Sequence, residues 1–177
     1  EPMRTTQLRC IEAAKAAGAY IALDPNYRAS LWRGEGDFLR QTERLLALAD
    51  YVKLSDEETA LVTGKAHPQA ALEVLAGRGV KTAVVTLGKD GAMALSGGQL
   101  VQAPGVPAAA VDATGAGDAF WGGFLYRLLR QGYPMAAQSA EMLADCLAFG
   151  NRVGAYCVGH LGAISGMPTM AQLETMR

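Results

Sequence analysis

Apolar residues along the chain recur at two spacings, one typical of helices and one typical of buried strands. In residues 5–17, Leu8, Ile11 and Ala14 lie at helical spacing, and Gly18 follows where a helix cap is expected. Short apolar runs bounded by turn residues predict strands. The pattern predicts helices at 5–17, 37–49, 55–64, 68–77, 116–130 and 134–155 with a further terminal helix, and strands at 19–24, 51–54, 81–88, 91–96 and 99–104.

The alternation of strands and helices predicts an α/β fold with a doubly wound, mostly parallel sheet and helices on both faces. Gly97 and Gly98 separate the last two strands and predict a hairpin. We find no repeat, low-complexity tract or linker, so we expect residues 1–177 to belong to one domain. In such sheets, ligands bind beyond the carboxyl ends of the strands.

Composition narrows the classes of function. Half of the 177 residues are hydrophobic and 19% are charged, which is typical of a globular protein, and the net charge of -1 with a pI near 6.2 argues against nucleic-acid binding. Cys10, Cys146 and Cys157 lack the number and spacing of a disulfide framework or a zinc site, which favours the reducing cytoplasm. No apolar run is long enough to span a membrane.

The start of the chain, EPMRTTQLRC, lacks the charged and apolar regions of a signal peptide. It also lacks an initiator methionine. We therefore expect the true amino terminus to lie upstream.

The stretch VDATGAGDAFWGGF, residues 111–124, carries the strongest chemical signal. Glycines allow a tight turn, and backbone N–H groups left open at a helix start bind anions. Gly115, Ala116 and Gly117 are thus candidates for an anion hole. Asp118 beside them is a candidate general base, because its carboxylate could accept the proton of a substrate hydroxyl.

A simpler interpretation is that Asp118 only complements the helix dipole, which contributes about 0.3–1 kcal/mol. Three other turns favour a functional interpretation. They follow predicted strands at the same expected edge of the sheet, at residues 24–28, 55–58 and 86–91.

The motifs DATGAGDAF, VVTLGKDGA and DPNYR occur in the order seen in the ribokinase-like (PfkB) family of carbohydrate kinases, which the chain resembles over about residues 1–170. DPNYRASLW and VKLSDEE are most similar to the fructokinase-type members. The resemblance implies phosphoryl transfer from ATP to a sugar hydroxyl. Asp118 would be the base, and Gly115, Ala116 and Gly117 would form the anion hole.

The resemblance also implies nucleotide, metal and substrate contacts. Glu58 would help to hold Mg²⁺ through water, and Asp112 and Thr114 would line a site for a monovalent cation such as K⁺, completed by carbonyls of the GHLGAISG loop. Arg28 and Asn26 are substrate candidates, and Arg28 could instead pair with Asp24 or Glu35. The nucleotide-binding candidates are Thr86, Gly88, Gly91, Asn151 and Ser55. Lys53 is interpreted as a strand-end charge, and His67 and His160 as structural or exposed.

The sequence departs from the family pattern at several points. Ser55 stands where many members have asparagine, Ala113 replaces a common threonine, and Arg152 adjoins Asn151. The amino-terminal half of the family's fold, with its β-lid and most sugar contacts, has no counterpart here. Family members often form homodimers through that lid.

We therefore expect the ATP-binding, carboxy-terminal portion of a cytoplasmic fructokinase-like enzyme with a sugar and ATP as partners, and little activity from this portion alone. The alternative is a non-catalytic nucleotide-binding module or an inactive fragment of the same fold. A dinucleotide-binding oxidoreductase fits poorly, because no G-x-G-x-x-G follows the first strand.

Overall fold

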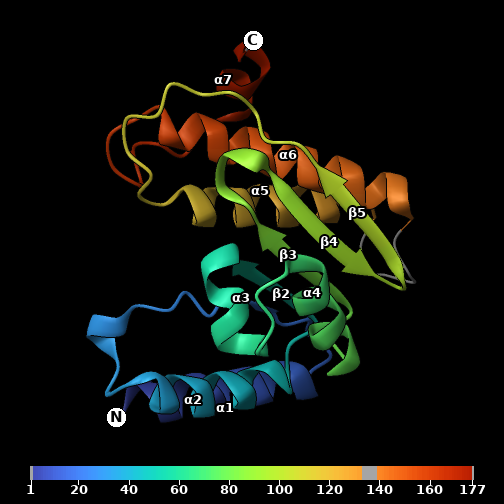
Figure 1. Ribbon diagram of the computed structural model, residues 1–177. Coiled ribbons are helices and arrows are strands. Elements are labelled where there is room, and N and C mark those ends of the chain that lie inside the picture. Colours follow the sequence, from blue (N-terminus) through green and yellow to red (C-terminus); the bar gives the residue numbers. More distant parts are fainter. Residues whose placement is uncertain (1, 133–138, 177) are drawn as a thin grey trace. The chain divides into compact units, whose positions relative to one another are not determined.

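A computed structural model describes residues 2–132 and 139–176 of the chain (Figure 1). These residues form two compact units, Glu1–Val85 and Thr86–Arg177. The first unit contains α1 (Met3–Ala16), β1 (Ala22–Leu23), the 3-10 helix η1 (Ala29–Leu31), α2 (Glu35–Leu46), β2 (Tyr51–Ser55), α3 (Asp56–Thr63), α4 (Pro68–Gly77) and nearly all of β3 (Thr82–Thr86). The second contains the 3-10 helix η2 (Gly88–Asp90), β4 (Ala92–Ser96), β5 (Gln99–Ala103), α5 (Ala116–Arg130), α6 (Ala140–Val158) and α7 (Met170–Thr175).

Buried apolar strands form the centre of the first unit, where the strand order is β1-β2-β3. β1 and β2 run parallel, with Ala22 opposite Tyr51 and Leu23 opposite Val52. Residues 51–54 and 82–85 are all buried, whereas the two residues of β1 are not. Continuous burial along β2 and β3 is typical of strands covered on both faces, and explains why most of their residues are apolar without alternation. Lys53 is the charged exception in β2.

Asp50, in the turn before β2, joins several elements of the first unit. The side chain is almost fully buried, and its carboxylate accepts hydrogen bonds from Lys15 Nζ at 2.6 Å and from the Ile21 amide at 3.0 Å. Lys81 Nζ lies 3.0 Å from its other oxygen. The Asp50 carbonyl accepts from the amides of Lys81 and Thr82. One residue thus connects the end of α1, the start of β1 and the start of β3.

Replacing Asp50 by asparagine should destabilise the protein by about 1–3 kcal/mol at neutral pH, because charge-assisted bonds are lost. Burial alone would raise the pKa of Asp50, but the bonds from Lys15, Ile21 and Lys81 outweigh it and lower the pKa. A lowered pKa gives stability that is fully present above the unfolded pKa of about 3.9 and is lost as the pH falls through the folded pKa.

Urea unfolding of the wild type and of Asp50→Asn, measured from neutral to acid pH, tests this. The difference between their free energies of unfolding should shrink below about pH 4. Glu12→Gln, which removes an exposed carboxylate from α1, is the control. A difference that stayed constant into acid would contradict this role for Asp50.

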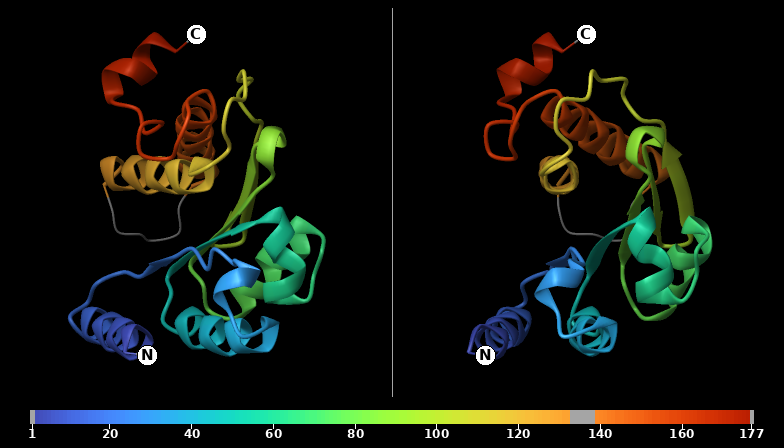
Figure 2. Two further views of the ribbon diagram at one scale, coloured as in Figure 1. Left: turned by 90° about the vertical axis from the view of Figure 1, so that its left-hand side faces the viewer. Right: turned by 60° about the vertical axis from the view of Figure 1, so that its left-hand side comes forward.

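The second unit is built from a hairpin and two long helices. β4 and β5 pair antiparallel, with Ser96 opposite Gln99 across the Gly97–Gly98 turn, as the sequence predicts. α6 contacts both strands and α5, so that α6 lies between the hairpin and α5 (Figures 1 and 2). The start of α5, which carries the glycine-rich motif, is therefore positioned by its packing against α6.

Glycines allow α5 and α6 to approach closely. A Cβ atom at Gly123 would lie 2.7 Å from the side chain of Val153, and one at Gly150 would lie 2.9 Å from the ring of Phe120. These distances are shorter than an ordinary van der Waals contact, so a side chain at either position would push the helices apart.

Gly150→Ala should consequently destabilise the protein by about 1–3 kcal/mol through overpacking. Gly122→Ala is a matched control, because Gly122 is exposed on α5 and a Cβ there would meet no atom within 4 Å. We expect the control to be neutral or to stabilise by up to about 1 kcal/mol, since alanine favours helices. Thermal unfolding of the wild type and of both variants measures these changes in stability. Equal changes at the two positions would refute the close-packing argument.

The sequence patterns locate most elements correctly. Helices predicted at 68–77 and 116–130 have those bounds, and the α/β class is confirmed. β1 is shorter than the predicted strand at 19–24, and α6 continues to Val158, beyond the predicted end at 155. The predicted beginning of that helix, including Pro134, lies outside the described residues. Within the described ranges, no helix has the length and apolar character needed to cross a bilayer.

Candidate functional site

The turn before α5 leaves several backbone amides open. Gly115 has a φ of +80°, a conformation that glycine adopts readily, and the Ala116 amide donates to Ala113 O at 3.2 Å. Across the described residues, the amides of Gly115, Gly117 and Asp118 donate no hydrogen bond. These open donors sit at the positive end of a 15-residue helix, where an anion is favoured.

Asp118 lies in the first turn of α5 with its side chain exposed, whereas the next two residues are buried. The carboxylate is thus accessible beside the open amides. An exposed carboxylate next to donors for an anion could accept the proton of an alcohol bound there.

Asp112 and Thr114 form a compact hydrogen-bonded turn just before this helix. Asp112 Oδ1 accepts from the Thr114 amide at 2.9 Å and from its hydroxyl at 2.6 Å, and Oδ2 accepts from the Gly162 amide at 2.9 Å. These bonds lower the pKa of Asp112, with the Thr114 hydroxyl as the largest cause. The structure thus brings the two predicted cation-site residues together with the GHLGAISG loop.

The predicted nucleotide turn follows β3 and is shaped by glycines. The Leu87 amide donates to Gly91 O at 2.8 Å, and Gly91 has a φ of +98°. A Cβ at Gly91 would lie 2.2 Å from the carbonyl oxygen of Ala103, so only glycine fits. Thr86 ends β3 just before this turn, and Gly88 begins η2 within it.

Asn151, on α6, is buried, with 8% of its surface exposed. Its side chain forms hydrogen bonds to the backbone at the end of β5. Its Nδ2 donates to Ala103 O at 3.3 Å and to Pro104 O at 2.9 Å. Ala103 O is also the atom that crowds Gly91. Asn151 therefore supports the chain segment against which the predicted nucleotide turn packs.

In the first unit, Glu58 is buried while its neighbours Asp56 and Glu57 are exposed, so it is not part of a solvated acidic face. Its Oε2 accepts from the Ser55 amide at 2.9 Å and from the Ser55 hydroxyl at 3.1 Å, which completes a capping box at the start of α3. Its Oε1 accepts from the Tyr27 amide at 2.6 Å. Glu58 thus ties the DPNYR segment to α3.

Glu58→Ala should lower the free energy of unfolding by about 1–3 kcal/mol, because the part-buried amide of Tyr27 and the cap at Ser55 lose their acceptor. Glu57→Ala, one position earlier in the same acidic run, is the matched control and should change stability by less than about 0.5 kcal/mol. Chemical denaturation at neutral pH compares the two. Indistinguishable midpoints would show that the Glu58 bonds contribute little.

A buried ion pair was not predicted from the sequence. Lys53 Nζ lies 2.6 Å from Asp24 Oδ2, and the two side chains are 6% and 13% exposed. The sequence signal for this pair is weak. It consists of an acid, Asp24, just after β1 and a lysine, Lys53, on β2, two strands that lie side by side and parallel. Lys53 is therefore a buried residue, and Asp24 pairs with it.

The substrate candidates lie in the segment after β1. Asn26 is exposed and has a φ of +48°, which asparagine tolerates better than most residues. Arg28 is exposed, and its guanidinium donates to the Tyr27 carbonyl at 2.9 Å.

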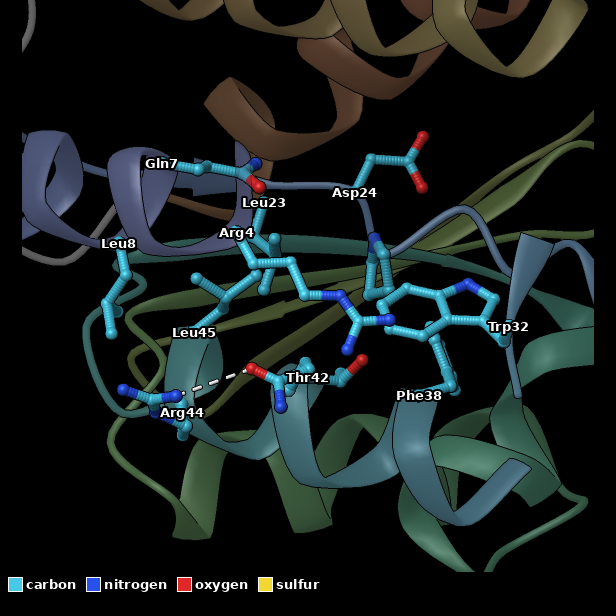
Figure 3. Close-up of a pocket in the computed structure, with 12 residues that line it drawn as sticks. Arg4, Gln7, Leu8, Leu23, Asp24, Trp32, Phe38, Thr42, Arg44 and Leu45 are labelled. Atoms are coloured by element: carbon cyan, nitrogen blue, oxygen red, sulfur yellow. Dashed lines mark hydrogen bonds between the residues drawn. The ribbon is translucent and has the colours of Figure 1, made fainter. Parts of the chain in front are cut away.

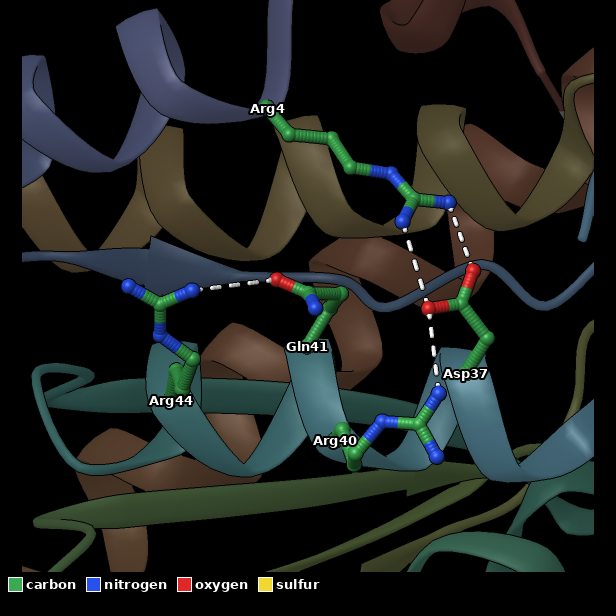
Figure 4. Close-up of polar contacts among 5 residues, drawn as sticks. All are labelled: Arg4, Asp37, Arg40, Gln41 and Arg44. Atoms are coloured by element: carbon green, nitrogen blue, oxygen red, sulfur yellow. Dashed lines mark hydrogen bonds and ion pairs between the residues drawn. The ribbon is translucent and has the colours of Figure 1, made fainter. Parts of the chain in front are cut away.

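A cavity of about 200 Å³ in the first unit is lined by α1, α2, the end of β1 and the residues Asp24, Pro25 and Trp32 that follow it (Figure 3). Arg4 lies over the ring of Trp32 at 4.9 Å and makes two bonds to Asp37, at 2.8 and 3.2 Å (Figure 4). The bonds from Arg4 lower the pKa of Asp37. The guanidinium thus connects α1 to α2. None of the predicted site residues lines the cavity.

The sequence pattern that defines the pfkB family carbohydrate kinases matches residues 1–170. This chain belongs to the pfkB family of carbohydrate kinases. A fructokinase of Klebsiella pneumoniae is 39% identical over 175 residues, which cover 98% of this chain and 56% of that protein. The chain spans about half the length of the curated relatives that it matches.

Solved structures agree with this assignment. A fructokinase double mutant from Vibrio cholerae O395, with fructose, ADP and potassium ion bound, is 32% identical with a TM-score of 0.88, covering 98% of this chain and 55% of that chain. An aminoimidazole riboside kinase from Salmonella enterica, with aminoimidazole riboside and an ATP analogue, is 32% identical with a TM-score of 0.83, covering 95% and 55%. The ribokinase-like fold is thereby confirmed.

Proposed function

We propose that this pfkB family chain is the nucleotide-binding and catalytic portion of an ATP-dependent, fructokinase-like sugar kinase. The observation that carries the proposal is the set of open amides at the start of α5 beside the exposed carboxylate of Asp118. Phosphoryl transfer requires positioning and neutralisation of charge more than covalent chemistry. A relative named fructokinase and two kinase structures with ADP or an ATP analogue bound favour this reaction class.

In this proposal, Asp118 accepts the proton of the attacking sugar hydroxyl. The amides of Gly115 and Gly117 donate to the oxygens of the transferred phosphoryl group, and Ala116 closes the turn that directs them. Because these donors are fixed before substrate binds, they need little reorganisation as charge develops.

ATP and Mg²⁺ are the proposed cofactors. Thr86, Gly88 and Gly91 would form the turn that approaches the nucleotide, with Asn151 supporting it. Glu58 would contribute to the magnesium site through water, which suits an ion that retains several waters. His, Cys, Asp and Glu side chains in the described residues form no cluster of three or more that could hold a metal, so phosphates and water would supply most ligands.

The remaining proposed contacts are to the acceptor and to a monovalent cation. Arg28 and Asn26 would face the sugar, with Ser55 near the nucleotide. A cation such as K⁺ would lie beside Asp112 and Thr114, with backbone carbonyls as ligands, and the Vibrio fructokinase structure contains potassium ion. The relatives are about twice as long as this chain, and we propose that the remaining sugar contacts come from the part of the fold that they have in addition. We also propose that the enzyme is cytoplasmic.

The test is Asp118→Asn, made in the protein expressed with whatever coding sequence precedes this chain. We expect kcat to fall by about 10²- to 10⁴-fold, because asparagine cannot accept the proton. ADP release is measured with MgATP and a panel of fructose, ribose, nucleosides and 2-keto-3-deoxygluconate. Glu174→Gln, an exposed position on α7, is the charge-matched control and should retain the wild-type rate.

Wild-type turnover by the Asp118 variant would remove this residue from the mechanism. No turnover with any acceptor by the intact protein would favour a non-catalytic nucleotide-binding module instead.

A further inference from the structure

Lys53 and Asp24 form an ion pair that the proposed mechanism does not use, and both side chains are largely buried. Lys53 Nζ lies 2.6 Å from Asp24 Oδ2, just beyond the carboxyl end of β1. β1 and β2 are parallel, with Leu23 opposite Val52. The same register, continued by one residue, sets Asp24 beside Lys53. The pair therefore extends the contact between the two strands past the point where β1 ends.

Stability alone does not explain a pair of this kind. Taking two charges out of water costs about as much as their attraction returns, so apolar side chains of similar volume often stabilise a protein equally well. Pro25 follows Asp24 and has no amide hydrogen, so its nitrogen cannot donate to a neighbouring strand. The ion pair thus connects the chain to β2 where the backbone of Pro25 offers no donor.

A second contact holds the other end of the same segment. The Tyr27 amide donates to Glu58 Oε1 at 2.6 Å. Between the two contacts, Asn26 has a φ of +48°, and within the described ranges it is the only non-glycine residue with a positive φ. Such a conformation persists where the surrounding contacts fix it. The ion pair at residue 24 and the bond at residue 27 thus anchor the backbone of Asn26 from both sides.

We propose that Lys53 is a positioning residue, whose ion pair anchors residues 24–27 so that Asn26 and Arg28 face the acceptor sugar. The proposal rests on the proposed function, in which these two residues contact the sugar. Lys53 is 6% exposed and already paired, so it acts through the segment and does not itself touch the substrate. The guanidinium of Arg28 donates to the Tyr27 carbonyl, so its direction depends on the anchored segment.

Backbone hydrogen exchange, followed by NMR in the full chain, tests the anchoring without reference to activity. In Lys53→Met, the Tyr27 amide should exchange at least about tenfold faster relative to the Val84 amide, because a charge-assisted bond that holds the segment is lost. Val84 is fully buried in β3 and reports opening of the whole unit. Lys15→Met, which removes the lysine paired with the buried Asp50, is the matched control and should leave this ratio unchanged.

The double variant Asp24→Asn/Lys53→Met separates positioning from stability. With both charges removed, no buried charge is left unpaired, so the free energy of unfolding should recover from that of Lys53→Met towards the wild-type value. The Tyr27 amide should nevertheless keep its faster exchange relative to Val84, because the ion pair is still missing. Recovery of this ratio together with stability, or an unchanged ratio in Lys53→Met, would overturn the proposal.

Activity gives a separate readout in the protein expressed with whatever coding sequence precedes this chain. There, the double variant should raise the KM for the acceptor sugar at least about tenfold, with smaller changes in kcat and in the KM for MgATP, because contacts to the bound sugar are weakened. Faster exchange at Tyr27 with a wild-type KM for the sugar would overturn the positioning role. Faster exchange in a protein that phosphorylates no acceptor would refute the proposed function and leave the anchoring of residues 24–27 intact.

Discussion

The close contact between α5 and α6 is the constraint on which the arrangement of the second unit depends. Gly123 on one helix and Gly150 on the other remove the side chains that would separate them, so that Val153 and Phe120 meet backbone directly. α6 in turn contacts both strands of the hairpin. The position of the α5 N-terminus, with its open amides, follows from this packing and not from the glycine-rich motif alone.

The turn before α5 combines satisfied and unsatisfied groups within a few residues. The Asp112 carboxylate, the Thr114 hydroxyl and the Ala116 amide all have partners inside the protein, while the amides of Gly115, Gly117 and Asp118 have none in the described residues. The first N–H groups of a helix have no intrahelical acceptor, so these amides remain available to a ligand. The bonded groups fix the geometry of the open ones.

In the first unit, most acidic side chains near the strand ends serve the fold. Asp50 joins α1, β1 and β3, Asp24 pairs with Lys53, and Glu58 caps α3 while holding the Tyr27 amide. A structural role does not exclude a water-mediated contact to Mg²⁺ for Glu58, because each carboxylate oxygen accepts more than one bond. It does mean that replacing any of these acids alters stability, and activity measurements on such variants need a stability control.

The sequence by itself determined the α/β class, the hairpin, the bounds of helices such as 68–77 and 116–130, and the family, because periodicity, glycines and caps act between near neighbours in the chain. It also indicated that Asp118 stands beside a glycine-rich turn. Only the tertiary structure decided which donors surround each carboxylate. Gly162 lies fifty residues from Asp112, Tyr27 thirty-one from Glu58, and Lys53 twenty-nine from Asp24, and no local pattern specifies partners that folding brings together from such distances.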